Sequence, residues 1–245
     1  MVDPWNLHAS YGPQPFDIRF VYSQLMVYQA PFFRSQKGIL GRVLGGWSIS
    51  PLFTAQSGAP LQVNVGTGSN SDAQAFGEIY GNNNRAHENA VLTAPFNAGN
   101  SAHNNVTSSG PAGINGNAAK GGSGINLFAD PNATYALFRR PILGYDTTGG
   151  GAGVIRGLSS WSLDTTISKE IRASERFGAT LIIQITNVLN HFQPANPPMN
   201  IDSPQTWGVI TDQSTVGALS GIGGTPGGVP AINPRQMEFG LRVHF

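Results

Sequence analysis

Cysteine is absent from this chain, and the charged residues Asp, Glu, Lys and Arg make up only 11% of its 245 residues. The absence of cysteine excludes disulfide scaffolds and thiolate metal sites. Soluble domains ordinarily carry about a quarter of their residues as charged types, so this composition is unusual for one. The chain also has no run of about 18 apolar residues, which excludes a transmembrane helix.

Glycine and proline are abundant instead, with 32 and 17 residues. The mean hydropathy is −0.13, so the apolar residues must be spread thinly along the chain. A transmembrane β-strand needs only about 9–11 residues and alternates apolar with polar side chains, which keeps the average hydropathy low. The net charge is +1 with no basic run, so nucleic acid is not an expected partner. The start, MVDPWNLHASYGP, is not a secretory signal, so an exported protein would have lost its signal or be present here in part.

The clearest periodicity lies in the last segment, 235–245, which predicts an amphipathic strand. Gln236, Glu238 and Arg242 share one face of this strand, and we expect that face to point to a barrel lumen. The opposite face is apolar, and we expect it to meet lipid and to carry the signal for barrel assembly. It consists of Met237, Phe239, Leu241, Val243 and Phe245.

Four further segments show the same alternation, and no comparable helical pattern appears. They predict strands over 17–30, 46–65, 156–169 and 176–190. Pro51 lies inside the second of these and should weaken its hydrogen-bond ladder locally. The fold class is therefore predicted to be all-β, with antiparallel amphipathic strands.

The connections between these strands alternate between short and long. The short ones follow Tyr28 and Ser168 and are rich in Arg and Lys, whereas the long ones, 66–153 and 191–234, are rich in Gly, Asn, Ser and Pro. Outer-membrane barrels have short periplasmic turns and long outer loops, and structureless loops of this length are rare in compact soluble domains. We therefore expect 1–245 to be the C-terminal part of one outer-membrane β-barrel, an open sheet of about five strands.

The run RGLSSWSLDTTISKEIRASERFGATLIIQITNVLNHFQPANPP and the closing PRQMEFGLRVHF resemble the C-terminal end of TonB-dependent outer-membrane receptors, in the Oar-like branch. In that branch a strand ending in Asn-x-x-Asn-His precedes a Pro/Asn-rich loop, and here these residues are Asn187, Asn190 and His191. The segments YGPQPFDIRFVYSQLMVYQAPF and GGWSISPLFTAQSGAPLQV resemble two consecutive barrel strands of the same branch. The resemblance covers most of the chain outside 66–152.

This resemblance implies an outer-membrane protein that transports or binds a ligand through its loops and barrel mouth. Members of the family also have a plug domain, a motif that meets TonB, and about twenty-two strands, none of which this chain displays in full. The implied partners are outer-membrane lipid, the barrel-assembly machinery, and the remainder of the barrel with its plug; TonB would act only through the missing segments. In place of an acidic residue expected shortly before Asn187, the chain has Gln184.

Catalytic, cofactor and metal sites are not predicted. The five histidines are scattered without metal-site spacing, and Asp164 is simpler to interpret as a lumen-facing polar residue than as a partner of His191. A terminal aromatic such as Phe245 resembles the signal of the barrel-assembly machinery, although it would also suit an interface aromatic girdle. The alternative hypothesis is a secreted or surface β-sandwich that binds glycan or protein and hides its apolar face against a second sheet.

Overall fold

The computed structural model describes residues 13, 17–65, 88–97, 101–104, 106, 109–140, 142, 145–146, 152–172, 177–211 and 234–245. They form two compact units. The sheet unit comprises Phe20–Gln56, Ser160–Gln193 and Ala231–Phe245, and the connection unit comprises Met1–Arg19, Ser57–Ser159 and Pro194–Pro230. Each unit is described by itself.

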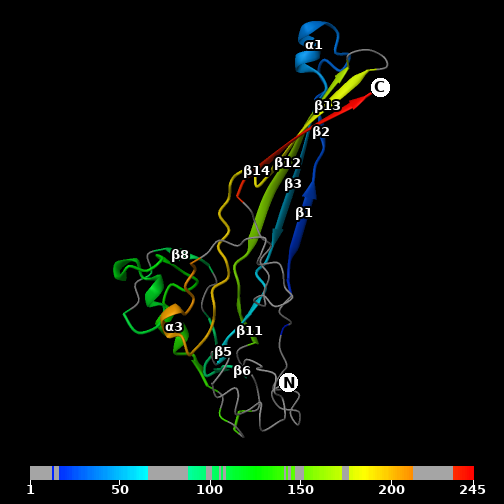
Figure 1. Cartoon of the computed structure of the whole chain (residues 1–245). Coiled ribbons are helices and arrows are strands. Elements are labelled where there is room, and N and C mark those ends of the chain that lie inside the picture. The colour runs from blue at the N-terminus through cyan, green and yellow to red at the C-terminus, as the bar shows by residue number, and fades with distance from the viewer. Residues whose placement is uncertain are drawn as a thin grey trace. The chain divides into compact units, whose positions relative to one another are not determined.

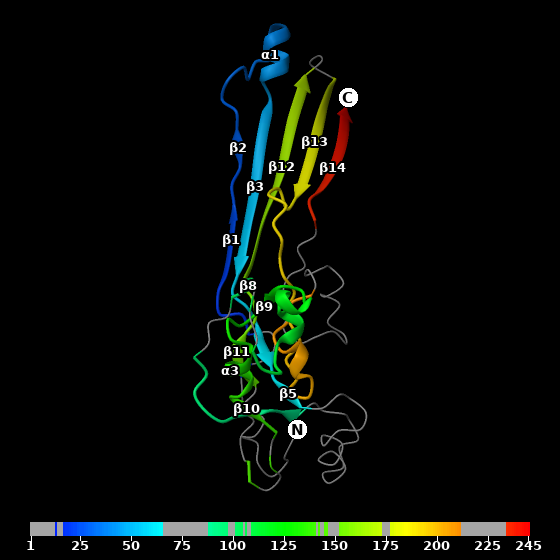
Figure 2. The same cartoon turned by 90° about the vertical axis from the view of Figure 1, so that its left-hand side faces the viewer.

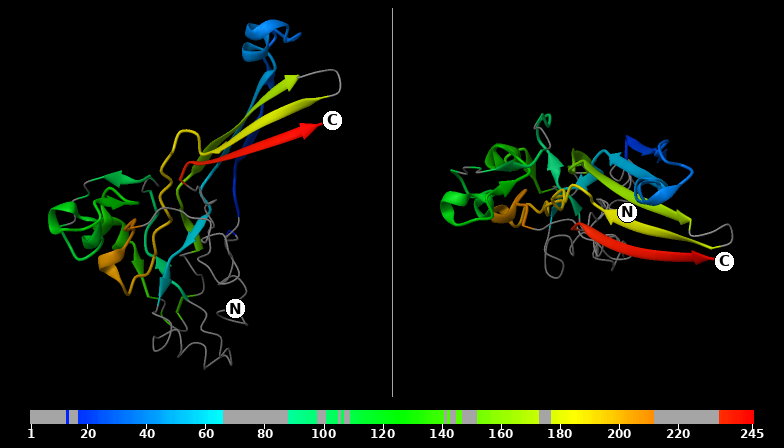
Figure 3. Two further views of the ribbon diagram at one scale, coloured as in Figure 1. Left: turned by 45° about the horizontal axis from the view of Figure 1, so that its top comes forward. Right: turned by 90° about the horizontal axis from the view of Figure 1, so that it is seen from above.

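The sheet unit is one open antiparallel layer in the order β1-β3-β12-β13-β14, with β2 beside β1 on the same edge of β3 (Figures 1 and 2). Its strands are β1 (Val21–Leu25), β2 (Tyr28–Gln29), β3 (Trp47–Gln56), β12 (Ser160–Arg172), β13 (Gly178–Thr186) and β14 (Gln236–His244). Figure 3 shows β12, β13 and β14 side by side from two further directions. The prediction of an all-β fold with an open sheet is confirmed.

β12 is the centre of this layer and is paired on both sides. It pairs with β3 from Ser160 to Lys169 and with β13 from Thr165 to Arg172. The alternation that predicted these strands is the pattern that a strand with two unlike faces requires. The layer therefore has β1 with β2 at one edge and β14 at the other.

Pro51 lies in the middle of β3, between two neighbouring strands. Its carbonyl accepts the Met26 amide at 3.0 Å. In an antiparallel strand the N–H and C=O of one residue point to the same neighbour, so the donor that proline lacks is missing on this side. The ladder is accordingly interrupted between β1 and β2, while the pairing of Pro51 with Thr165 of β12 continues unbroken.

The connection between β2 and β3 was predicted as a turn but contains a helix, α1 (Gly38–Leu44). This connection also completes the ladder of β12 beyond Trp47, where β3 begins. The Gln36 side chain donates from Nε2 to the Glu170 carbonyl at 2.8 Å and accepts the Arg172 amide on Oε1 at 3.0 Å. The buried carboxamide thus replaces a peptide group of the missing strand, next to the backbone bond from Glu170 to Gly46.

The connection unit contains paired short strands and small helices. The pairs are β4 (Pro60–Gln62) with β11 (Ala152–Arg156), β5 (Asn64–Val65) with β6 (Glu88–Asn89), β7 (Val91–Leu92) with β10 (Phe138–Arg139), and β8 (His103–Asn104) with β9 (Ile125–Asn126). The helices are η2 (Ile114–Gly116), η3 (Ala118–Lys120), α3 (Pro131–Tyr135) and η4 (Pro204–Thr206). Asp130 is the N-cap of α3, and its carboxylate accepts a hydrogen bond from the Ala133 amide at 3.0 Å.

A hydrophobic core holds the described part of the connection unit together. Its centre is Trp207, which is fully buried and donates from Nε1 to Thr134 Oγ1 at 3.1 Å. The ring lies 6.2 Å from Phe128 and 5.5 Å from Phe138 between centroids. Buried aromatic side chains of this size contribute strongly to stability.

This core corrects the expectation that 66–153 and 191–234 are structureless loops. Described parts of both segments pack against each other around Trp207. The predicted strand 46–65 is also divided, because β3 ends at Gln56 and the residues after it belong to the connection unit. The segments 66–87 and 212–233 lie outside the described residues.

The junction of α1 and β3 depends on Gly46, which has a φ of +77°. A Cβ at this position would lie 2.3 Å from Gln36 Nε2 and 2.4 Å from the Glu170 carbonyl. We expect Gly46→Ala to destabilise the folded sheet by about 1–3 kcal/mol, because a non-glycine residue in this region is strained and the Gln36 bridge would be displaced. Urea unfolding of the chain refolded in detergent measures this.

Gly240→Ala is the matched control. Gly240 also lies in the sheet, but a Cβ there would come no closer than 3.7 Å to its neighbours, an ordinary contact. We expect this variant to unfold at the urea concentration of the parent or above it. An equal loss of stability in both variants would contradict the role given to the Gln36 bridge.

Candidate functional site

The functional feature of the sheet unit is the difference between its two faces. Residues directly opposite each other in an antiparallel pair lie on the same face, so the register assigns every side chain. The apolar face consists mainly of Met237, Phe239, Leu241 and Val243 of β14, Ala179, Leu181, Ile183 and Ile185 of β13, Trp161, Leu163, Ile167 and Ile171 of β12, and Trp47, Ile49, Pro51, Phe53 and Ala55 of β3. Gln24 of β1 and Thr165 and Lys169 of β12 are polar exceptions on this face.

The polar face is dominated by hydroxyl, amide and charged groups. It includes Gln236, Glu238 and Arg242 of β14, Thr180, Gln184 and Thr186 of β13, Ser162, Asp164, Thr166, Ser168 and Glu170 of β12, and Ser48, Ser50 and Thr54 of β3. Neighbouring strands are linked there by hydroxyl pairs, Ser48 with Ser168 at 2.6 Å and Thr54 with Ser162 at 3.1 Å. Val21 and Leu25 of β1, Leu52 of β3 and Ile182 of β13 are apolar exceptions on this face.

Aromatic side chains lie toward both ends of the apolar face. At the end where β3 leaves the sheet, Tyr22, Phe53 and Trp161 form a row with centroid spacings of 6.1 Å. Trp47 lies toward the opposite end, beside α1. From Trp161 to Ile171 the strand rises about 33 Å at roughly 3.3 Å per residue. A tilt of about 40° reduces this to a height of roughly 25 Å, which is the height of the lipid-facing band of a barrel.

The residues Asn187, Asn190 and His191 form the turn by which the chain leaves β13. Asn187 and Asn190 have φ values of 50° and 49°, a left-handed conformation that asparagine tolerates. The Asn187 side chain accepts the His191 amide at 2.7 Å and donates to its carbonyl at 3.0 Å. The Asn187 amide donates to Asp164 Oδ1 at 2.8 Å, and the His191 ring stacks on Trp161 at 4.0 Å.

Asp164 and His191 are therefore separated by the sheet rather than brought together. Asp164 lies on the polar face opposite Leu52, whereas His191 stacks on Trp161 of the apolar face. Among the described residues, no group of three or more His, Cys, Asp or Glu side chains is placed to hold a metal ion. No helix in that part of the chain is long and apolar enough to cross a membrane.

The predicted site residues of the terminal strand are all exposed, and Phe245 is 95% exposed at the chain end. Exposure alone does not separate the two faces of β14, because the polar residues of this edge strand are exposed as well. The register does separate them, since Met237, Phe239, Leu241 and Val243 lie opposite Ile185, Ile183, Leu181 and Ala179. Their contact with lipid and the assembly role of Phe245 stay predictions.

Lys169 is a feature that the alternation did not reveal. It lies on the apolar face, opposite Leu181 and Trp47. Its ammonium group leaves that face by donating to the carbonyls of Val43 and Gly45, at 2.8 and 2.7 Å, and lies 4.7 Å from the centre of the Trp47 ring. A lysine near a strand end can keep its stem on apolar surface while its head reaches polar groups. The missed signal was a single cation in the apolar register of β12.

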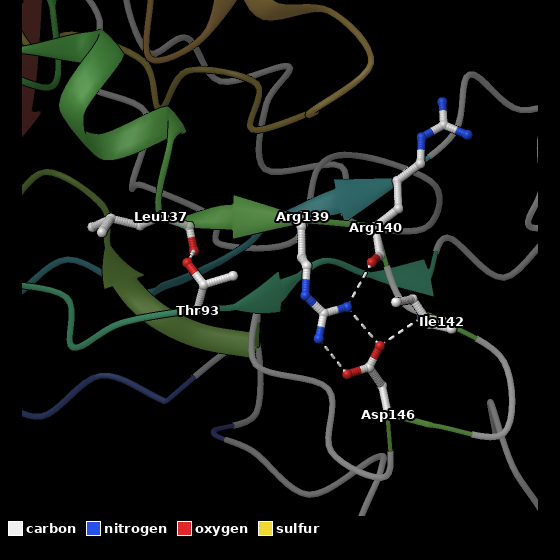
Figure 4. Close-up of polar contacts among 6 residues, drawn as sticks. All are labelled: Thr93, Leu137, Arg139, Arg140, Ile142 and Asp146. Atoms are coloured by element: carbon white, nitrogen blue, oxygen red, sulfur yellow. Dashed lines mark hydrogen bonds and ion pairs between the residues drawn. The ribbon is translucent and has the colours of Figure 1, made fainter.

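The connection unit has a polar clasp where β10 ends (Figure 4). The Arg139 guanidinium binds both carboxylate oxygens of Asp146, at 2.6 and 2.7 Å. The Ile142 amide donates to the same carboxylate. The hydrogen bonds that the Asp146 carboxylate accepts from Arg139 hold its pKa below the ordinary value, and the hydrogen bond from the Ile142 amide adds to this lowering. Two parallel bonds fix the geometry of such a pair better than one.

A family model described as an outer membrane beta barrel domain matches residues 1–222. The chain belongs to this outer-membrane β-barrel family. The expected outer-membrane localisation is thereby confirmed, and the match favours the barrel over the secreted-sandwich hypothesis. Among curated proteins and among solved structures, nothing matches the chain. β14 follows the matched range, and its place in the sheet comes from its pairing with β13.

The assignment of the faces predicts unequal effects of charge on β14. Leu241→Arg places a charge on the apolar face, where a position near the membrane midplane costs about 2–4 kcal/mol. We expect a sharp loss of assembled barrel, measured by heat-modifiable migration after outer-membrane fractionation. Gly240→Arg places the same charge on the polar face and should be milder. Equal loss in both variants would show that the register is misassigned.

The clasp predicts a pH dependence in the connection unit. Because the folded pKa of Asp146 is lowered, the stabilisation by Arg139 is present above the ordinary carboxyl pKa and is lost as the pH falls through the lowered value. We expect Arg139→Gln to raise the titration midpoint of the Asp146 carboxyl, measured by NMR. Arg140→Gln is the control, since the Arg140 side chain pairs with Asp202 instead. An unchanged midpoint in Arg139→Gln would contradict the clasp.

Proposed function

We propose that the chain forms barrel wall and outer, ligand-facing loops of a TonB-dependent transporter of the Oar-like branch. The observation that carries the proposal is the single sheet layer with one apolar and one polar face. A wall between lipid and an aqueous lumen needs this division, and a layer in a soluble sandwich would cover its apolar face. The membrane supplies that cover here.

The two ends of the sheet support the orientation. The helix α1, the pair of Arg172 with Gly178 and the end of β14 all lie at one end of the strands. The long connections leave from the other end, after Gln56 and before Ser160, which pair with each other. Because outer-membrane barrels have short turns in the periplasm, we assign the α1 end to the periplasm and the connection unit to the outside.

The assignment to the TonB-dependent class rests on the strand-exit motif and its neighbouring segments. This motif, Asn187, Asn190 and His191, forms a specific turn rather than a catalytic group. A structural turn is what we expect of a motif that barrels with different ligands share. A plug and earlier strands would then precede this segment in the full protein. The test is to sequence the DNA upstream of Met1. An open reading frame that continues upstream and encodes a plug and earlier strands supports the class. An upstream stop codon, followed by a signal sequence joined directly to this segment, argues against it.

The ligand would meet the connection unit and the barrel mouth. The described part of this unit consists of short strands and small helices around an aromatic core. We infer binding and transport rather than catalysis, because Asp164 and His191 lie on opposite faces of the sheet. No cofactor is required for this function.

The open layer predicts that the chain alone is not a pore. One edge is formed by β1 and β2 and the other by β14. Closure in lipid requires every edge to be paired. Bacterial outer-membrane barrels have at least about eight strands. We expect no single-channel conductance from the purified monomer in planar bilayers, with a complete barrel as the positive control. Stable conductance of the monomer would overturn the assignment as part of a larger wall.

We propose further that Phe245 is read by the barrel-assembly machinery. It ends the edge strand and is almost fully exposed, so it contributes little packing to the folded sheet. Deleting Phe245 in the full-length protein should therefore impair insertion in cells while leaving urea stability of the refolded barrel close to that of the parent. Insertion is followed by outer-membrane fractionation.

Deletion of residue 245 also shortens the strand, so Phe245→Leu serves as the matched variant. It keeps an apolar side chain but removes the ring. Poor insertion of both variants with normal stability supports recognition of the aromatic terminus. Normal insertion of both would reduce Phe245 to an ordinary girdle residue.

A further inference from the structure

The helix α1 presents an apolar surface that no described part of the sheet unit covers. Its members are Ile39, Leu40, Val43 and Leu44, which we call the rim surface. Their exposed fractions are 83%, 70%, 57% and 43%. At 100° per residue these positions span an arc of about 140° on one side of the helix, with Gly38, Gly41 and Arg42 outside it. The phenylalanines before the helix, Phe32 and Phe33, are exposed as well.

The rim surface is tied to the end of the apolar face. The Val43 carbonyl accepts both the Trp47 indole N–H, at 3.0 Å, and the Lys169 ammonium group. Both donors come from residues in the apolar register of β3 and β12. The helix is therefore held at the end of the apolar face, where Figure 2 shows it beyond the strands.

The charged residues of the connection that contains α1 have one sign. Arg34, Lys37 and Arg42 lie in or beside the helix, and no acidic residue occurs from Ala30 to Gly46. Apolar side chains on one side of a short helix and basic side chains beside them are the combination that binds at the boundary between lipid headgroups and acyl chains. Anionic headgroups attract such cations most strongly.

We propose that α1 is an interfacial membrane anchor, with the rim surface inserted at the headgroup–acyl boundary of the periplasmic leaflet and its basic residues among phospholipid phosphates. The proposal rests on the proposed function, because that function assigns the apolar face to lipid and the α1 end to the periplasm. Continuity with the lipid-facing surface selects lipid as the occupant. A second copy or a periplasmic protein on the rim surface is an outcome that the experiment detects.

The absence of cysteine allows a direct test by site-specific labelling. Single variants Leu40→Cys, Lys37→Cys and Leu241→Cys, made in the full-length protein that completes the barrel, carry an environment-sensitive fluorophore. They are inserted into vesicles of phosphatidylethanolamine and phosphatidylglycerol. Quenching by iodide in the water is compared with quenching by lipids that carry a nitroxide near the headgroup or deep in the acyl chain.

We expect the Leu40 label to lose most of its iodide quenching and to be quenched best by the shallow nitroxide. The Leu241 label should be quenched best by the deep nitroxide, and the Lys37 label should remain accessible to iodide. Because all three sites are exposed side chains, the labels should not prevent folding.

The outcomes separate the anchor from the wall. If the Leu241 label is in lipid and the Leu40 label is as accessible to iodide as the Lys37 label, the anchor is wrong and the wall stands. If the Leu40 label is protected from iodide but untouched by either nitroxide, a protein surface covers it and the anchor is again wrong. If the Leu241 label is in water, the wall assignment fails and the anchor fails with it.

Discussion

A strand within a membrane has no water to complete its backbone hydrogen bonds, and this requirement accounts for the least regular parts of the sheet. Pro51 would leave a gap in any central strand, but its missing donor faces the edge where β1 and β2 are already separate. β12 continues past Trp47, the first residue of β3. There the Gln36 carboxamide supplies the donor and the acceptor of the absent peptide group. At the end of α1, the Lys169 and Trp47 side chains donate hydrogen bonds to the Val43 carbonyl. Side chains thus complete backbone hydrogen bonds beside the start of β3 and at the end of α1.

The two units satisfy the hydrophobic effect in different ways. The connection unit buries its own apolar residues around Trp207, so its described part has an interior. The sheet unit is one layer thick, and a single layer cannot cover its own apolar face. Its stability must come from a medium or a partner on that face, and we propose lipid in that role. The scarcity of charge fits both solutions, because neither a lipid-facing surface nor a Gly/Asn-rich loop surface requires many ionised groups.

How far the sequence predicts this fold depends on the length of each pattern. β12, β13 and β14 are long enough for alternation to identify them, and the sheet register follows from matching their apolar residues. The helix α1 escaped because seven residues containing two glycines give a weak helical signal. The core around Trp207 escaped because its members are single apolar residues in short strands, brought together only by tertiary contacts. The role of Lys169 was not predicted because its partners, the carbonyls of Val43 and Gly45, lie far away in the sequence.

The strand-exit motif shows why a short resemblance can be more informative than a long loop. Asn187 must adopt a left-handed φ, donate its amide to Asp164, and use both ends of its carboxamide on the His191 backbone. Aspartate could not donate from its side chain and glycine has no carboxamide, so few residues satisfy all of these demands. The turn places His191 on Trp161 of the apolar face while it fixes Asp164 on the polar face. The motif therefore specifies where the chain leaves the sheet, and this geometric requirement involves no ligand.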